Sequence, residues 1–144
     1  MSRHSVAGLS TVAGTTLRAV ASVFGTATMG PVLRQVSVAN TTTTEVYVAL
    51  VRFTNATGVG AGLTEVDHNH LQPATATAFA GHTADGAVGS PIEYFMLGAA
   101  KGSGVFWTFG DSGLLLPVGT ANGFGVICPS GTGQILTYSY TWDE

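Results

Sequence analysis

Two histidines separated by a single residue are the best candidates for metal binding in this chain. His68 and His70 lie in a locally polar segment and would point the same way from an extended backbone, as a chelating pair. Zinc normally requires a third or fourth protein ligand, which Glu65, Asp67 or the distant His82 could supply. Because the pair alone is an incomplete ligand set, we favour a polar loop or a subunit contact here and predict no bound metal.

A serine between glycines is the second feature that could do chemistry. Residues 110–113 have the sequence Gly-Asp-Ser-Gly, which surrounds the nucleophile of chymotrypsin-like proteases, with Ser112 in the place of the nucleophile. The protease motif has another glycine where this chain has Leu114. The double barrel that brings a histidine and a carboxylate to such a serine also needs far more than 144 residues. We therefore predict a β-turn at Ser112 and no catalytic residue.

Glycine clusters could bind phosphate groups only in a particular setting. Residues 58–62, 98–104 and 119–125 are rich in glycine, but a phosphate loop needs a preceding strand, a following helix and a Gly-Lys-Ser/Thr order. Residues 98–104 contain Lys101 without that order. We predict no cofactor and no enzymatic activity.

Charge is sparse in this chain of 144 residues. Only 9% of the residues are charged, against about 25% in an average soluble domain, and the net charge is −3. The five basic residues are scattered singly, which argues against nucleic-acid binding. Interfaces of permanent assemblies are depleted in charge, so this composition favours a homo-oligomer.

The single cysteine excludes an internal disulfide, so packing must hold the fold together. We expect Cys128 to be buried as a small hydrophobic side chain. No run of apolar residues predicts a membrane span, and polar residues interrupt any export signal near the N-terminus. We predict no membrane partner.

Alternating apolar and polar residues predict β-strands along most of the chain. In the last strand Leu136, Tyr138, Tyr140 and Trp142 would share one face, which must be buried. The longest strand, residues 44–54, is apolar on both faces and should be covered on both sides.

Turn residues connect the remaining strands. Residues 113–116 and 124–128 are predicted to form a hairpin, with the second strand ending at Pro129. Other strands are predicted at residues 17–23, 32–38, 74–80, 92–97 and 104–109.

Eight to ten short strands predict a single all-β domain over residues 1–144. The architecture we expect is an antiparallel β-sandwich, most simply a jelly roll. Residues 1–14 could form an N-terminal arm that reaches a neighbouring subunit, because termini outside a core are free to dock elsewhere.

Several stretches together resemble a family of virion proteins. These are Gly-Ala-Ala at 98–100, residues 103–111, Gly-Thr-Ala-Asn-Gly at 119–123 and the closing Trp-Asp-Glu at 142–144. They are similar to the decoration, or cement, class of minor virion proteins of tailed bacteriophages, over about two thirds of the chain. The resemblance implies a β-sandwich that oligomerises, commonly as a trimer, and clamps major capsid proteins on the outside of the head. It implies assembly in the host cytoplasm and carries over no individual site or interface residue.

Two other functions remain open at this point. One is a glycan- or receptor-binding module of a phage tail or fibre on the same sandwich, which exposed rings of Trp107, Tyr94 or Phe124 would favour. The other is an enzyme that uses Ser112 or a metal at His68 and His70.

Overall fold

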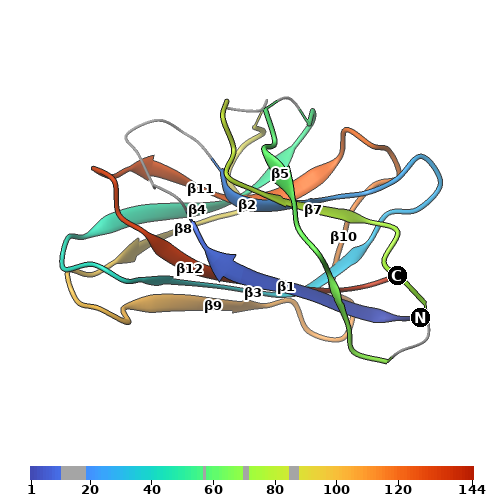
Figure 1. The fold of residues 1–144 in the computed structure, drawn as a ribbon, viewed down its shortest axis with the longest axis horizontal. Helices are drawn as coiled ribbons and strands as arrows, with labels where there is room; N and C mark the ends of the chain where they lie inside the picture. Colours follow the sequence, from blue (N-terminus) through green and yellow to red (C-terminus); the bar gives the residue numbers. More distant parts are fainter. Residues whose placement is uncertain (11–18, 57, 70–71, 85–87) are drawn as a thin grey trace.

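The protein is a two-layered sandwich of β-sheets in a computed structural model (Figure 1). The structure describes residues 1–10, 19–56, 58–69, 72–84 and 88–144, and among these there are twelve strands and no helix. The strands are β1 (Arg3–Leu9), β2 (Ala19–Phe24), β3 (Val32–Asn40), β4 (Val46–Phe53), β5 (Ala61–Gly62), β6 (Val66–Asp67), β7 (Thr77–Ala80), β8 (Glu93–Leu97), β9 (Gly104–Thr108), β10 (Leu114–Leu115), β11 (Gly123–Ser130) and β12 (Leu136–Asp143).

The expected all-β sandwich with antiparallel sheets is confirmed, whereas the jelly-roll topology stays a prediction. Sheet 1 has the order β10-β3-β12-β1-β6, with β9 also paired to β3, and sheet 2 has the order β5-β7-β2-β11-β4-β8. The number of strands exceeds the expected eight to ten. Three of the twelve have only two residues, too few to show an alternating pattern in the sequence.

The strand β12 supplies the centre of the core, as its alternation predicts. Leu136, Tyr138, Tyr140 and Trp142 are all buried in the main hydrophobic cluster between the two sheets. On either side β12 pairs with β3 and β1 over nearly its whole length, so it is the central strand of sheet 1.

The strand β4 is covered on both faces, as its sequence predicts. Val48 and Leu50 face the main core, whereas Val51 and Phe53 belong to a second cluster on the outer face of sheet 2. Partly buried Val59 and other apolar residues of the connections pack over that outer cluster. A strand buried on two sides needs no polar face, which explains its nearly continuous apolar run.

A buried tyrosine joins the two sheets by hydrogen bonds. Tyr140 of sheet 1 donates its hydroxyl proton to the carbonyl oxygen of Ala21 at 2.8 Å and accepts from the backbone N–H of Val126 at 3.0 Å. The register between β11 and β2 shifts immediately after Val126, so the bulge leaves backbone groups that the phenol satisfies. Burial raises the pKa of Tyr140, so its hydroxyl keeps its proton.

The predicted hairpin of residues 113–116 and 124–128 is wrong. The strand β10 pairs with β3 in sheet 1, whereas β11 lies between β2 and β4 in sheet 2. The turn residues between them reverse the chain but carry no signal for which sheet receives the next strand. The strand β11 also continues past Pro129 to Ser130, because a register irregularity accommodates the missing backbone N–H of proline.

The predicted N-terminal arm is wrong for residues 3–9. These residues form β1, which pairs with β12 along its whole length and with the short β6 on its other side. The inward residues His4 and Val6 are buried. The alternation is short, and the serine and glycine residues around it conceal it in the sequence. Residues 11–14 lie outside the described residues, as does the predicted beginning of β2 at Leu17.

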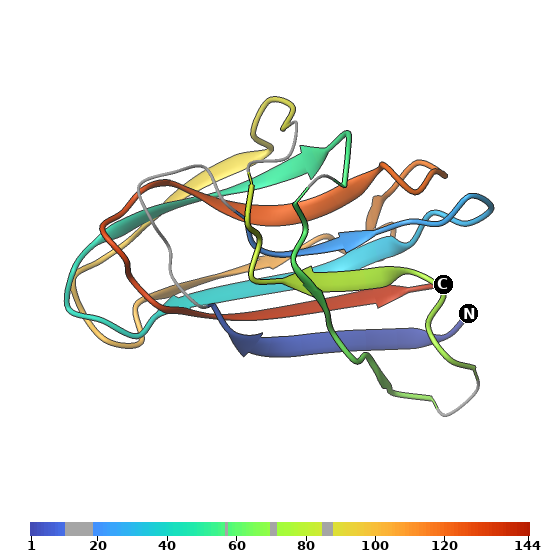
Figure 2. The same ribbon diagram turned by 45° about the horizontal axis from the view of Figure 1, so that its top comes forward.

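Both termini lie at the same end of the sandwich (Figure 2). The backbones of Ser2 and Glu144 exchange two hydrogen bonds of 2.9 Å. Beside them the buried carboxylate of Asp143 accepts from Arg3 at 2.8 and 3.1 Å and from Arg34 at 2.6 Å. The hydrogen bond from Arg3 is the largest of the effects that lower the pKa of Asp143.

Candidate interaction surface

The serine of the protease-like motif lies in an exposed turn between β9 and β10. Arg34 donates a hydrogen bond from Nη1 to the carbonyl oxygen of Asp111 and thereby fixes this turn to β3. No described histidine forms a hydrogen bond with Ser112. Among the described residues, the Gly-Asp-Ser-Gly motif is therefore a turn that Arg34 fixes to sheet 1.

Of the proposed metal ligands, the described His68 and His82 contact different sheets. His68 is exposed and its Nε2 lies 2.8 Å from Oγ of Ser5 on β1, in sheet 1. His82 instead contacts sheet 2, and His70 lies outside the described residues. In the described ranges no three histidine, cysteine, aspartate or glutamate side chains form a group that could hold a metal ion.

A buried serine–histidine pair, which the sequence did not indicate, lies on the outer face of sheet 2. Nε2 of His82 lies 2.8 Å from Oγ of Ser22, and the imidazole stacks on Phe53 with 6.1 Å between the ring centroids. Burial lowers the pKa of His82 to about 4, so the ring is neutral near pH 7. Because Ser22 is fully buried, no substrate can reach its hydroxyl. The pair holds the connection after β7 against the sheet.

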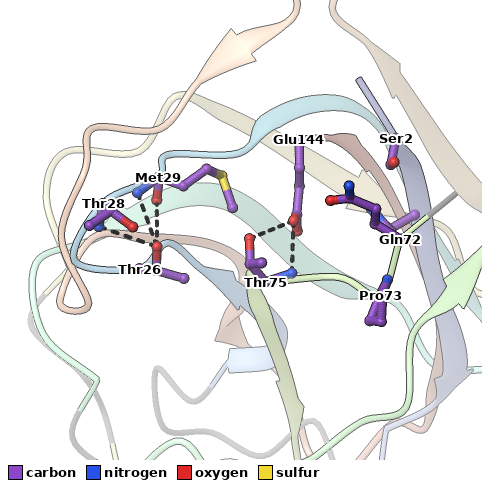
Figure 3. Close-up of a pocket in the computed structure, with 9 residues that line it drawn as sticks. Ser2, Thr26, Thr28, Met29, Gln72, Pro73, Thr75 and Glu144 are labelled. Carbon is purple, nitrogen blue, oxygen red and sulfur yellow. Dashed lines mark hydrogen bonds between the residues drawn. The ribbon is translucent and has the colours of Figure 1, made fainter.

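The end of the sandwich that carries the termini contains a cavity of about 300 Å³ (Figure 3). The carboxylate of Glu144 lies in its wall and accepts hydrogen bonds from the backbone and hydroxyl of Thr75 at 2.7 and 2.6 Å. It also accepts from the backbone of Ala76 and from Nε1 of Trp142, both at 2.9 Å. Burial alone would raise the pKa of Glu144, but these bonds outweigh it and the pKa is lowered. Four donors saturate the carboxylate, which thus closes this end of the core.

The most prominent exposed feature is an apolar edge where β8 and β9 run along one side of the sandwich. We define the apolar edge as Tyr47, Tyr94, Phe95, Met96 and Phe106. These side chains are 46%, 59%, 40%, 48% and 60% exposed. Tyr47 lies opposite Met96 on the neighbouring strand, and with Tyr94 these two side chains form one group on the outer face of sheet 2, whereas Phe95 shares the inner face with Val48. Phe106 of β9 pairs with Ser37 and lies on the outer face of sheet 1, on the other side of the sandwich.

Both strands of the apolar edge are outermost in their sheets. Among the described residues β8 pairs only with β4, and β9 pairs only with β3. Their outer backbone groups therefore face solvent alongside exposed rings. An edge strand with an apolar surface is a ready template for another chain, and exposed apolar patches of this kind mark interaction sites.

The three rings that could have formed a sugar-binding platform have different positions. Trp107 on β9 and Phe124 on β11 are buried, whereas Tyr94 on β8 is exposed.

Cys128 is fully buried, as expected, and burial raises the pKa of its thiol to about 12. It is not a reactive thiol.

Comparison with family models, with curated proteins and with solved structures finds no match to this chain. The described residues also contain no helix that is long and apolar enough to cross a membrane.

Proposed function

We propose that this chain is a structural virion protein that decorates a bacteriophage capsid on its outside and stabilises it by binding major capsid protein subunits. The observation that carries the proposal is the apolar edge, a nearly uncharged border of the sandwich to which no further described strand is paired. The resemblance of residues 98–100, 103–111, 119–123 and 142–144 to decoration proteins supports major capsid protein as the partner of that edge.

The size of the apolar edge suits a protein partner. A large aromatic side chain buries roughly 150–250 Å² when it is fully covered. Tyr47, Tyr94 and Met96 share the outer face of sheet 2, and because each is about half exposed they offer roughly 300 Å² there. A stable interface buries roughly 800 Å² on each partner, so this group would be the centre of a binding surface that its surroundings complete.

Attachment of this kind needs no chemistry. A partner that binds only the assembled shell stabilises that shell by its binding free energy. Because only Glu93 on β8 is charged in these two strands, the attachment would depend on apolar burial. We therefore expect it to respond weakly to salt, unlike binding by charged surfaces.

The positions of the aromatic rings support this proposal over a glycan-binding module. Two of the three candidate rings, Trp107 and Phe124, are packed in the core and cannot stack on a sugar. Tyr94 is exposed, but it stands in a row of apolar side chains on a strand edge. Such a row is suited to a protein surface.

The proposal can be tested with capsids that lack this protein, assembled from the major capsid protein of the same virus. Phe106→Lys places a charge on the apolar edge, and Val118→Lys changes an equally exposed apolar residue outside that edge as a control. We expect the native protein and Val118→Lys to sediment with the capsids and Phe106→Lys to remain in the supernatant. Failure of the native protein to sediment with them would overturn the proposal.

A further inference from the structure

The cavity beside the termini gathers polar side chains from segments that are far apart in the sequence. Ser2 lies before β1, Thr28 in the turn between β2 and β3, and Gln72 in the connection between β6 and β7. Figure 3 shows Thr28 on one side of the cavity and Gln72 on the other. Within the described ranges the side chains of these three residues form no hydrogen bond. Their polar groups are therefore available to a ligand.

The imidazole of His4, which also lines the cavity, lacks a partner as well. His4 is 1% exposed and lies against Trp142, with 6.0 Å between the ring centroids. Neither of its ring nitrogen atoms has a hydrogen-bond partner in the described part of the chain. Buried polar groups of native proteins are paired with protein, water or a ligand. Since no described protein group pairs with this ring, the cavity that it lines is where a partner can bind.

The charge of the cavity wall excludes several kinds of ligand. Among the described residues that line it, Glu144 is the only carboxylate, and there is no lysine or arginine. An anion would therefore be repelled. Each oxygen atom of this carboxylate already accepts two hydrogen bonds from the protein. No lone pair is left for an ammonium group or a metal ion, so the wall favours an uncharged ligand.

We propose that this cavity binds a small uncharged molecule rich in hydroxyl groups, of the size of one sugar ring. The hydroxyls of Ser2 and Thr28 and the amide of Gln72 can each both donate and accept a hydrogen bond, as can a neutral imidazole at His4. A hydroxyl group of a ligand has the same double capacity. A molecule with several hydroxyls can therefore pair with all of these groups at once.

The size and the apolar part of the cavity suit such a ligand. Met29 and Pro73 in the wall offer apolar surface to the C–H groups of a sugar ring, so no aromatic platform is needed. Ligand sites have volumes of about 300–1,000 Å³, and this cavity of about 300 Å³ is therefore suited to one ring. The site shares no residue with the apolar edge, so it goes beyond the proposed function and does not depend on it.

The experiment is a titration of the isotope-labelled full chain with D-glucose, D-galactose and N-acetyl-D-glucosamine, followed by amide NMR spectra. We expect at least one of these sugars to shift the amide signals of Thr28, Thr75 and Ala76 until the site is saturated. Acetate and methylammonium, as anionic and cationic probes, should leave the same signals unchanged.

Variants of the cavity wall locate the binding. Thr28→Val removes one hydroxyl from the wall, and Thr108→Val is the matched control because Thr108 is also exposed but lies on β9, outside the cavity. Loss of one hydrogen bond should weaken binding about fivefold, whereas the control should bind like the native protein. His4→Phe keeps a ring against Trp142 and should also weaken binding. The amide spectrum of each variant shows whether it is folded, and Thr28→Val alone decides if His4→Phe is not.

The inference is overturned if none of the three sugars saturates these signals. It is also overturned if Thr28→Val binds as tightly as the native protein, or if acetate or methylammonium binds in the cavity and the sugars do not. The capsid sedimentation of Phe106→Lys is a separate readout, so failure of this site and failure of the proposed function can be told apart.

Discussion

The neighbouring strands β4 and β8 are both largely apolar but have opposite surroundings. Both carry apolar side chains on their two faces, Val46–Phe53 in one and Glu93–Leu97 in the other. In β4 six of eight residues are buried, because β11 and β8 flank it and two clusters cover its faces. In β8 only Leu97 is buried. An apolar run on an interior strand indicates packing in the core, whereas an apolar run on an edge strand indicates a binding surface for another chain.

The largest effect should follow from removing a side chain on the interior strand. Leu50 on β4 is fully buried in the main core. Truncation to alanine removes its packing and leaves a cavity, so we expect Leu50→Ala to lower the free energy of unfolding by about 3 kcal/mol. Urea denaturation followed by tryptophan fluorescence measures it. A loss below about 1 kcal/mol would mean that β4 is not an interior strand.

A smaller loss is expected at the hydroxyl that joins the two sheets beside β4. Tyr140→Phe keeps the buried ring but leaves the N–H of Val126 and the carbonyl of Ala21 without their partner. Since an unsatisfied buried polar group costs about 1–3 kcal/mol, we expect a loss of about 2 kcal/mol. Denaturant unfolding of the variant, compared with Leu50→Ala, gives the order of the two effects. A variant as stable as the native protein would show that the two hydrogen bonds of the Tyr140 hydroxyl do not stabilise the fold.

The outer cover of β4 should respond to pH through His82. The folded protein lowers the pKa of His82 to about 4, below its ordinary value of 6.5. The unfolded chain therefore binds more protons between these values. Stability should be complete above about pH 6.5 and fall as the pH drops toward 4, by about 1–2 kcal/mol after allowance for solvent screening.

A glutamine at the same position serves as the matched control, because it can bond to Ser22 but does not titrate. Thermal unfolding of the native protein and of His82→Gln between pH 7 and pH 4 measures the difference. We expect the native protein to lose stability relative to the variant as the pH falls. Parallel curves for the two proteins would contradict the assignment.

The smallest effect on stability is expected on the apolar edge. Phe106 on β9 is 60% exposed, so Phe106→Ala removes little that the folded chain has covered. We expect the free energy of unfolding to change by less than about 0.5 kcal/mol, while capsid binding is lost. A loss comparable to that of Leu50→Ala would place this ring in a core instead of on an interaction surface.

Strand positions were predictable where one face alone is buried. The alternation of β12 gives both its residues and its buried face, because a side-chain period of two reports one-sided burial directly. The sequence predicts an arm in place of β1 because serine and glycine obscure the two inward residues His4 and Val6. The partners of β10 and β11 could not be predicted, since turn residues specify a reversal and not the sheet that follows.

The apolar edge could not be predicted from the sequence for a related reason. The pattern of residues 92–97 predicts a strand with apolar faces, but whether such a strand is interior depends on how many neighbours it has. Pairing across distant parts of the chain decides that number. The pair of Ser22 and His82, which are sixty residues apart, likewise depends on pairing that no local spacing reveals.

Hydrogen–deuterium exchange of the protein, free and bound to capsids, tests the central claim most directly. The account predicts that amides of β8 and β9 exchange rapidly in the dilute free protein and become protected on the capsid, while those of β4 and β12 are protected in both states. Protection that appears elsewhere, with β8 and β9 exchanging equally fast in both states, would contradict the apolar edge as the surface of assembly.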